Sequence, residues 1–146
     1  MVMRGAMETL TGPGHPVRTI ASALSTFSFL GALVTDVAYW RASDIQWANF
    51  SAWLLAIGIL LGGLSLIVEL VHIFSRRRQT STGWWGIVVL VIALGVALAD
   101  NFVHARDGWT SVVPSGLILS AITVALMIAT LAMTANGDRV RVGDLP

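Results

Sequence analysis

The sequence predicts an all-α integral membrane protein whose four transmembrane helices form an up-down-up-down bundle. Its 146 residues are 55% hydrophobic and only 12% charged, whereas a soluble domain carries about 25% charged residues. The run from Phe50 to Phe74 contains one charged residue, Glu69, and lacks the polar stripe that a soluble helix shows to water. At about 1.5 Å of rise per residue this run reaches roughly 37 Å, which exceeds a hydrocarbon core of about 30 Å.

Residues 1–16 form a polar N-terminal segment that includes the helix breaker TGPGHP. Pro16 suits the first turn of a helix, because its missing N–H would be unpaired there anyway. The first span therefore runs from about 17 to 39. Its apolar run is longer than the core of a secretory signal peptide, and no small-x-small cleavage site follows it. We interpret it as a retained anchor.

Three further apolar runs predict the remaining spans. They cover about 50–74, 84–103 and 115–134. With the first span they make a transmembrane domain over 17–134, and a polar C-terminal tail follows over 135–146. Because the connecting segments are short, sequential helices pack antiparallel.

Aromatic residues gather at the predicted ends of the spans. The loop between the first two spans, about 41–49, is short and has aromatic residues on both sides. Aromatic rings with a polar edge prefer the headgroup level of a bilayer, so the sequence predicts an interface belt. Its members are Tyr39, Trp40, Trp47, Trp53, Trp84, Trp85 and Trp109.

The arginines predict the orientation. All nine basic residues are Arg, and the cytoplasmic loops of membrane proteins carry an excess of basic residues. With both termini in the cytoplasm, only Arg41 and Arg106 lie on the outer side. We therefore predict a multi-pass protein of the bacterial inner (plasma) membrane with cytoplasmic N- and C-termini. The arginines on the cytoplasmic side are Arg4, Arg18, Arg76, Arg77, Arg78, Arg139 and Arg141.

Composition and motifs exclude several classes of function. The chain has no Cys, which excludes disulfides, covalent c-type haem, iron–sulfur ligation and Cys-based zinc sites. A net charge of +1 provides no basic field for nucleic acid. The nucleotide-binding, hydrolase and kinase motifs are missing. Glu69-x-x-His72 is similar to a unit of di-iron bundles, but that site needs more Glu than the two present. We predict no catalytic residues and no metal site.

Small residues predict where helices pack closely. Gly58 and Gly62 form a small-xxx-small pair that Gly63 extends, and Ala93 and Ala97 form another. In lipid such faces bring helix backbones together. We expect them to make contacts within the bundle, and a homo-oligomer is the alternative.

Ionisable residues predict two polar layers. The first, the Glu69 layer, lies toward the cytoplasm and comprises His15, Arg18, Glu69 and His72. Glu69 and His72 are i and i+3 on one helix, and Arg18 lies at a depth at which it can pair with Glu69. One interpretation is a cofactor site in which two imidazoles are the ligands and Glu69 and Arg18 lie behind them, with the carboxylate orienting one imidazole. The other is a structural ion pair with interfacial histidines.

The second, the Asp36 layer, lies toward the outside. Asp100 and His104 are i and i+4 on one face, and Asp36 enters from the first span at a comparable depth. These three residues can bind a cation or relay a proton, although a single His is too few for a transition metal. The alternative is a hydrogen-bonded cap that holds three spans together. The full layer is Asp36, Asp44, Asp100, Asn101, His104 and Arg106.

The residues at the two ends of the domain are similar to those of a known family. His15 and Pro16 open the first span, Asp36 lies near its end, and NGDRVRVGD follows the last span. Over about 14–144 the chain resembles the bacterial four-span membrane-protein family catalogued as domain of unknown function 2231. Many members carry a His at the head of the third span, where this chain has Gly-Trp-Trp at 83–85. Some relatives look fused to Rieske or cytochrome modules, so the resemblance implies an electron-transfer setting without an established activity.

The leading functional prediction is a non-enzymatic inner-membrane protein embedded in the lipid bilayer. It would serve as an anchor or accessory subunit for a membrane or periplasmic protein partner, and the resemblance implies a redox or respiratory partner. The alternative is an electron-transfer protein that binds haem b or quinone, with His15 and His72 as the axial pair. Haem iron is commonly held by His, and bundles hold cofactors between their helices.

A third prediction is a small proton or ion transporter that uses Asp100, His104 and Glu69. Such a path has to cross a polar-poor middle, because Ser65 is the only hydroxyl-bearing residue between Leu54 and Val68.

Overall fold

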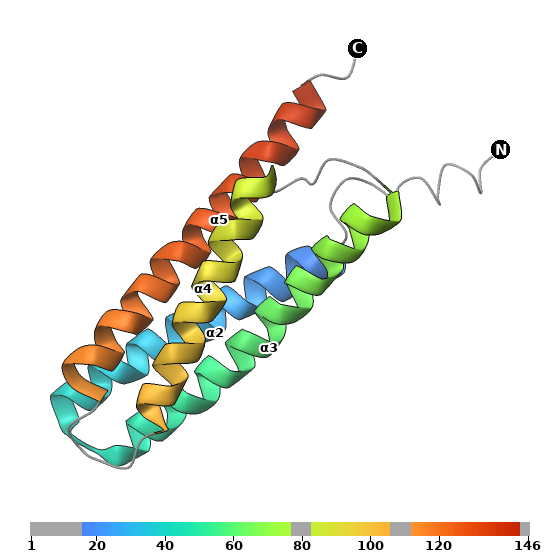
Figure 1. The fold of residues 1–146 in the computed structure, drawn as a ribbon. Coiled ribbons are helices and arrows are strands. Elements are labelled where there is room, and N and C mark those ends of the chain that lie inside the picture. The colour runs from blue at the N-terminus through green and yellow to red at the C-terminus, as the bar shows by residue number, and fades with distance from the viewer. Residues whose placement is uncertain (1–15, 77–82, 106–111, 144–146) are drawn as a thin grey trace.

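The computed structural model describes residues 16–76, 83–105 and 112–143, and within these ranges every regular element is helical. Figure 1 shows how the long helices are arranged. In chain order the elements are α2 (Pro16–Ala42), α3 (Ile45–Arg76), α4 (Gly83–His104), η1 (Val112–Gly116) and α5 (Leu117–Gly143).

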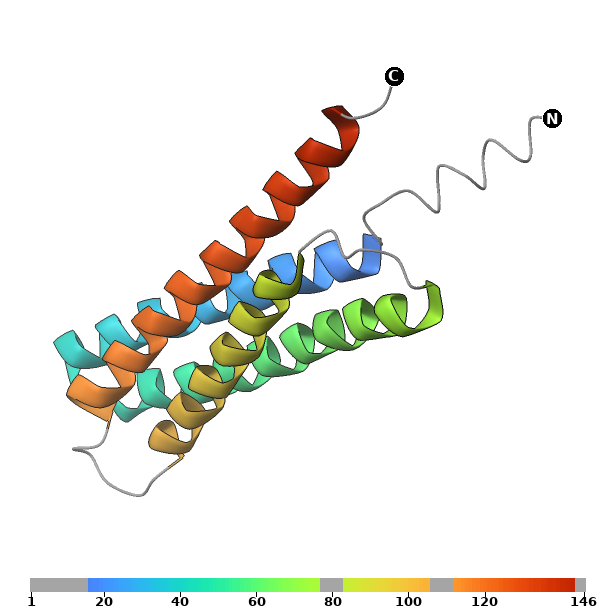
Figure 2. The same ribbon diagram turned by 45° about the horizontal axis from the view of Figure 1, so that its top comes forward.

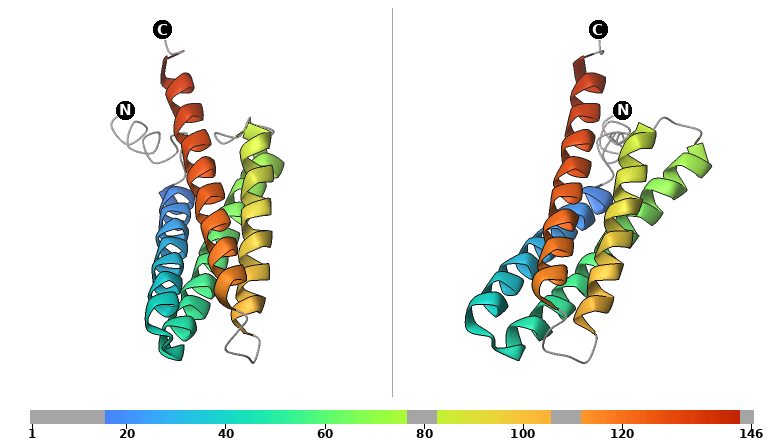
Figure 3. Two further views of the ribbon diagram at one scale, coloured as in Figure 1. Left: turned by 90° about the vertical axis from the view of Figure 1, so that its left-hand side faces the viewer. Right: turned by 60° about the vertical axis from the view of Figure 1, so that its left-hand side comes forward.

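The four helices form a ring in which each packs against two neighbours. α2 packs against α3 and α5, and α4 packs against the same two helices. Sequential helices run in opposite directions, so the start of α2 and the end of α5 lie at the same end of the bundle (Figure 1). At that end α5 reaches beyond the other helices (Figures 2 and 3). This is the up-down-up-down bundle that the sequence predicts.

All four long helices are long and apolar enough to cross a membrane. Only 28–33% of the residues in the apolar 18-residue window of each span are buried inside the bundle. The outer surface carries large apolar side chains such as Phe27, Leu60 and Phe102. Lipid tails accept such side chains at no cost, so the exterior of the bundle fits a bilayer. The four-span membrane fold predicted from the sequence is confirmed.

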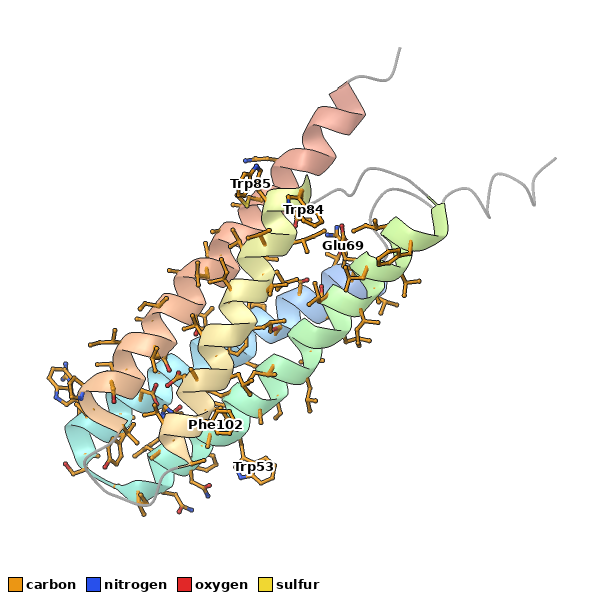
Figure 4. All side chains as sticks on the ribbon, viewed as in Figure 1. Trp53, Glu69, Trp84, Trp85 and Phe102 are labelled. Atoms are coloured by element: carbon orange, nitrogen blue, oxygen red, sulfur yellow. The ribbon has the colours of Figure 1, made fainter. Side chains whose placement is uncertain are left out.

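Exposed aromatic residues lie at both ends of the bundle. Trp84 and Trp85 are near the end that holds Glu69, whereas Trp53 and Phe102 are near the other end (Figure 4). The three tryptophans are among the most exposed large side chains. Their positions fit the headgroup level of a bilayer.

The turn between α2 and α3 is tighter than the predicted loop over 41–49. Only Ser43 and Asp44 lie outside the two helices. Ser43 has a left-handed φ of 53°, and its N–H donates to the Tyr39 carbonyl at 2.8 Å. Asp44 caps α3, because its carboxylate accepts a hydrogen bond from Gln46 N–H at 3.0 Å. This cap starts α3 five residues earlier than the apolar run.

The last helix, α5, starts two residues later than the predicted fourth span, 115–134, and ends nine residues beyond it. Val113 has extended dihedral angles (φ −116°, ψ 128°) inside η1, and the regular helix α5 follows from Leu117. At its other end α5 continues through Gly143, so most of the predicted polar tail is helical. The residues after Asn136 include no proline before position 146 to end the helix.

Small residues allow close packing in the interior. Ala93 and Ala97 are fully buried in a core with Phe29, Leu55 and Met127. A Cβ atom added to Gly58 would lie 2.6 Å from the Phe29 ring, and one added to Gly62 would lie 2.7 Å from Leu94. An atom added to Gly63 would meet nothing within 4 Å. The predicted contact face therefore includes Gly58 and Gly62, but Gly63 does not extend it.

Candidate functional site

A buried polar cluster joins all four helices near the end at which α2 meets α3. It consists of one side chain each from α2, α3 and α5 and two from α4. Each of these side chains is at most 1% exposed. We call it the Asp36 cluster, and its members are Asp36, Ser51, Asp100, His104 and Ser120.

Asp36 is the centre of the cluster. It lies six residues before the end of α2, a depth of roughly 9 Å along the helix. Its Oδ1 atom accepts a hydrogen bond from Ser51 Oγ and shares a hydrogen bond of 2.8 Å with His104 Nε2. Its Oδ2 atom accepts a hydrogen bond from Ser120 Oγ. Side chains from three other helices thus bond one carboxyl group.

Both ring nitrogens of His104 are engaged. Nε2 bonds Asp36, and Nδ1 lies 3.0 Å from the backbone carbonyl oxygen of Asp100, one helical turn earlier. No ring nitrogen is left for a metal ion. Within the described ranges, no group of three or more acidic or His side chains is arranged to hold a metal.

Asp100 is only partly satisfied. Its Oδ2 atom lies 2.7 Å from Ser120 Oγ. Its Oδ1 atom is 3.2 Å from His104 Nδ1, but the hydrogen on that nitrogen is directed to the Asp100 carbonyl. Oδ1 is therefore a buried oxygen without a hydrogen-bond partner in the described part of the chain.

The backbone of η1 closes over this side of the cluster. A Cβ atom added to Gly116 would lie 2.9 Å from His104 Cε1 and 3.5 Å from Asp100 Oδ1. Only glycine fits against the imidazole ring here without a shift of the ring or of the turn. The close contact leaves Oδ1 facing packed atoms.

The sequence did not predict the two serines of the cluster. Ser51 also bonds Thr35 Oγ1 at 2.6 Å, which extends the network along α2. Ser120 connects Asp36 with Asp100. Their only signal in the sequence is a hydroxyl in an apolar span at a depth similar to that of the predicted acids.

Two other members of the predicted Asp36 layer, Asp44 and Asn101, are not part of the cluster. Asp44 is exposed and caps α3. Asn101 is half-buried, and its carbonyl accepts a hydrogen bond from Ala105 N–H. Arg106 lies outside the described residues.

The Arg18 and Glu69 pair of the predicted Glu69 layer lies at the end of the bundle opposite the Asp36 cluster (Figure 4). Arg18 Nε is 3.3 Å from Glu69 Oε2, and both side chains are about 6% exposed. Below this pair Ser22 and Ser65 share a hydrogen bond of 2.5 Å. A cavity of about 10 Å³ adjoins these four residues and two threonines of α5, which is about the smallest space that holds one water molecule.

The histidines of the Glu69 layer cannot be placed. His15 and the side chain of His72 lie outside the described residues, so the haem or quinone site stays a prediction.

The middle of the bundle is not polar-poor, contrary to the expectation from the second span. The hydroxyls come from α2 and α5 instead of α3. Ser25 Oγ donates to the Gly58 carbonyl at 2.7 Å, and Thr26 bonds the Ser22 carbonyl. Thr123 is fully buried, and its hydroxyl has no hydrogen-bond partner within the described ranges.

Comparison with known proteins identifies a family. The profile of a family described as "Predicted membrane protein (DUF2231)" matches residues 14–136. The searches among curated proteins and among solved structures find no match.

Proposed function

Because the chain belongs to the family of predicted membrane proteins catalogued as domain of unknown function 2231, we propose that it is a non-enzymatic anchor or accessory subunit. It is embedded in the bacterial inner membrane, with both termini in the cytoplasm, and serves a membrane or periplasmic protein partner. The redox or respiratory nature of that partner is supported by the resemblance described above.

The observation that carries the proposal is the way in which the polar groups of the interior are used. Asp36 is hydrogen-bonded to Ser51, His104 and Ser120, and so connects α2 to the other three helices. Buried polar groups that are hydrogen-bonded to one another in this way hold a bundle in one arrangement. A fixed bundle with an apolar exterior is what a membrane anchor needs.

A photo-crosslinking experiment tests this proposal. A crosslinking amino acid is placed at one exposed position on each long helix, and the tagged chain is irradiated in native membranes. We expect at least one position to give a covalent adduct with a second polypeptide, which mass spectrometry identifies. The four positions are Phe27 on α2, Leu60 on α3, Phe102 on α4 and Ile118 on α5.

Phe29 is the matched buried control, because its ring is only 1% exposed and the crosslinking amino acid replaces another large aromatic side chain. A crosslinker there should give no adduct with a second protein. If all four exposed positions react only with lipid while the chain remains folded, the anchor or subunit role is wrong.

A further inference from the structure

Ser120 lies between the two carboxyl groups of the Asp36 cluster, and its contacts fix the number of hydrogens there. Its Oγ atom lies within hydrogen-bond distance of Asp36 Oδ2 and of Asp100 Oδ2, at 2.5 and 2.7 Å. A hydroxyl has one hydrogen to donate, whereas an ionised carboxylate can only accept. Both contacts are hydrogen bonds only if one of the two carboxyl groups carries a proton and donates it to Ser120.

His104 accounts for a second shared proton. A backbone carbonyl only accepts, so Nδ1 must carry a hydrogen to bond the Asp100 carbonyl. The contact between Nε2 and Asp36 Oδ1 also needs one hydrogen, on either atom. Whichever atom holds it, His104 and Asp36 together are uncharged. The proton required at Ser120 is additional to this one.

The donors around the two acids show which of them holds the additional proton. Asp36 has hydrogen-bond partners at both oxygens, Ser51 and His104 at Oδ1 and Ser120 at Oδ2, and such surroundings stabilise an ionised carboxylate. Among the described residues, the fully buried Oδ1 atom of Asp100 makes no hydrogen bond. His104 Nδ1 lies 3.2 Å from it but bonds the Asp100 carbonyl instead. Burying an ionised carboxylate with such an oxygen costs a large desolvation free energy, whereas burying the carbonyl oxygen of a neutral acid costs far less.

We propose that the Asp36 cluster is a proton-binding site in which Asp100 is a neutral carboxylic acid that donates through Oδ2 to Ser120. The cluster then has no net charge, which suits its place inside a membrane span. The titratable groups joined to Asp100 in the cluster are His104 from its own helix, α4, and, through Ser120, Asp36 from α2. From α3 and α5 the cluster includes the hydroxyls of Ser51 and Ser120.

The bound proton can move without a change in the charge of the cluster. The O–H bond at Asp100 Oδ2 breaks as a new one forms at Ser120 Oγ, and the original Ser120 hydrogen passes to Asp36 Oδ2. Asp100 becomes the carboxylate and Asp36 the acid. Ser120 thus connects two alternative sites for one proton on helices α4 and α2.

Infrared spectroscopy of the full chain in lipid bilayers at pH 7 tests the proposal. A carboxylic acid in water loses its proton near pH 4, so a carbonyl band from a protonated aspartate at pH 7 comes from a buried acid. We expect the wild type to show this band, Asp100→Asn to lose it, and Asp36→Asn to keep it. Asn fits at position 100 because its amide N–H replaces the acid as donor to Ser120.

A measurement on the wild type alone makes the test independent of how well a variant folds. Carbon-13 labelling of the aspartate side chains must shift the band, and labelling of glutamate must not. A wild type without any aspartate-sensitive acid band overturns the proposal. Loss of the band in folded Asp36→Asn with retention in Asp100→Asn overturns the assignment to Asp100.

Discussion

At the scale of single residues, the cost of each buried polar group depends on whether it has a partner. Arg18 and Glu69 lie at one end of the bundle with both side chains almost fully covered. A charge taken from water into such a site costs several kcal/mol, which only a close opposite charge offsets. Each of the two charged side chains is therefore tolerated in this buried position because the other is present.

A double-mutant cycle measures the interaction energy between Arg18 and Glu69. We expect Glu69→Leu alone to lower the free energy of unfolding by about 3–5 kcal/mol, because it leaves a buried guanidinium opposite an apolar side chain. Arg18→Met combined with Glu69→Leu should recover most of this loss. Unfolding in mixed detergent micelles, followed by near-ultraviolet circular dichroism, provides the free energies. Additive effects of the two substitutions on the free energy of unfolding would show that the ion pair does not stabilise the fold.

The meeting of Asp36, Asp100 and His104 could be anticipated from their spacing and depth along the spans. Ser51 and Ser120 could not, because the spans contain many hydroxyls and the sequence does not give the rotation of each helix. Ser28, for example, bonds the Leu24 carbonyl of its own helix. A serine becomes part of the cluster only through the direction in which its helix face points.

At the scale of elements, the contact between α2 and α3 depends on a glycine opposite an aromatic ring. Phe29 is 1% exposed, and its ring occupies the space that a side chain at position 58 would need. The ring is enclosed by the core, so it cannot move aside. Close approach at this point also lets Ser25 reach the Gly58 carbonyl.

Two glycine substitutions on the same helix distinguish packing from helix propensity. We expect Gly58→Ala to destabilise the bundle by about 1–3 kcal/mol, because the new methyl group overpacks the core. Gly63→Ala places its methyl group in open space, so it should be neutral or stabilise α3 by up to about 1 kcal/mol. Thermal unfolding in detergent measures both. Equal effects of the two substitutions would contradict the packing argument.

The number and order of the helices follow from the apolar runs, but the helix ends do not. The start of α3 depends on the Asp44 cap, which places polar Gln46 and Asn49 inside the helix. The end of α5 at Gly143 lies far beyond its apolar run. Hydropathy detects the part of a helix that lies in lipid, whereas caps and breakers decide where the hydrogen-bonded turns stop.

At the scale of the whole molecule, the two polar sites lie at opposite ends of the bundle. Arg18 and Asp36 are 18 positions apart on α2, a separation of roughly 27 Å along the helix. The end with Arg18 also holds Arg76, at the end of α3, whereas Arg41 lies at the other end, in the last turn of α2. The bundle is therefore asymmetric in charge, and the orientation of the asymmetry in the membrane can be measured.

The lack of cysteine makes single-cysteine labelling free of background. With the excess of arginine in the cytoplasm, we expect Ala42→Cys to react with an impermeant maleimide added to intact spheroplasts. Gln79→Cys should react only after the membrane is permeabilised. Ala97→Cys, which is fully buried, should react in neither state and shows that the bundle stays folded. The reverse pattern for positions 42 and 79 would place Arg76, Arg77 and Arg78 outside the cell and invert the proposed orientation. Because the four helices alternate in direction, one such pair of positions fixes the orientation of the whole bundle.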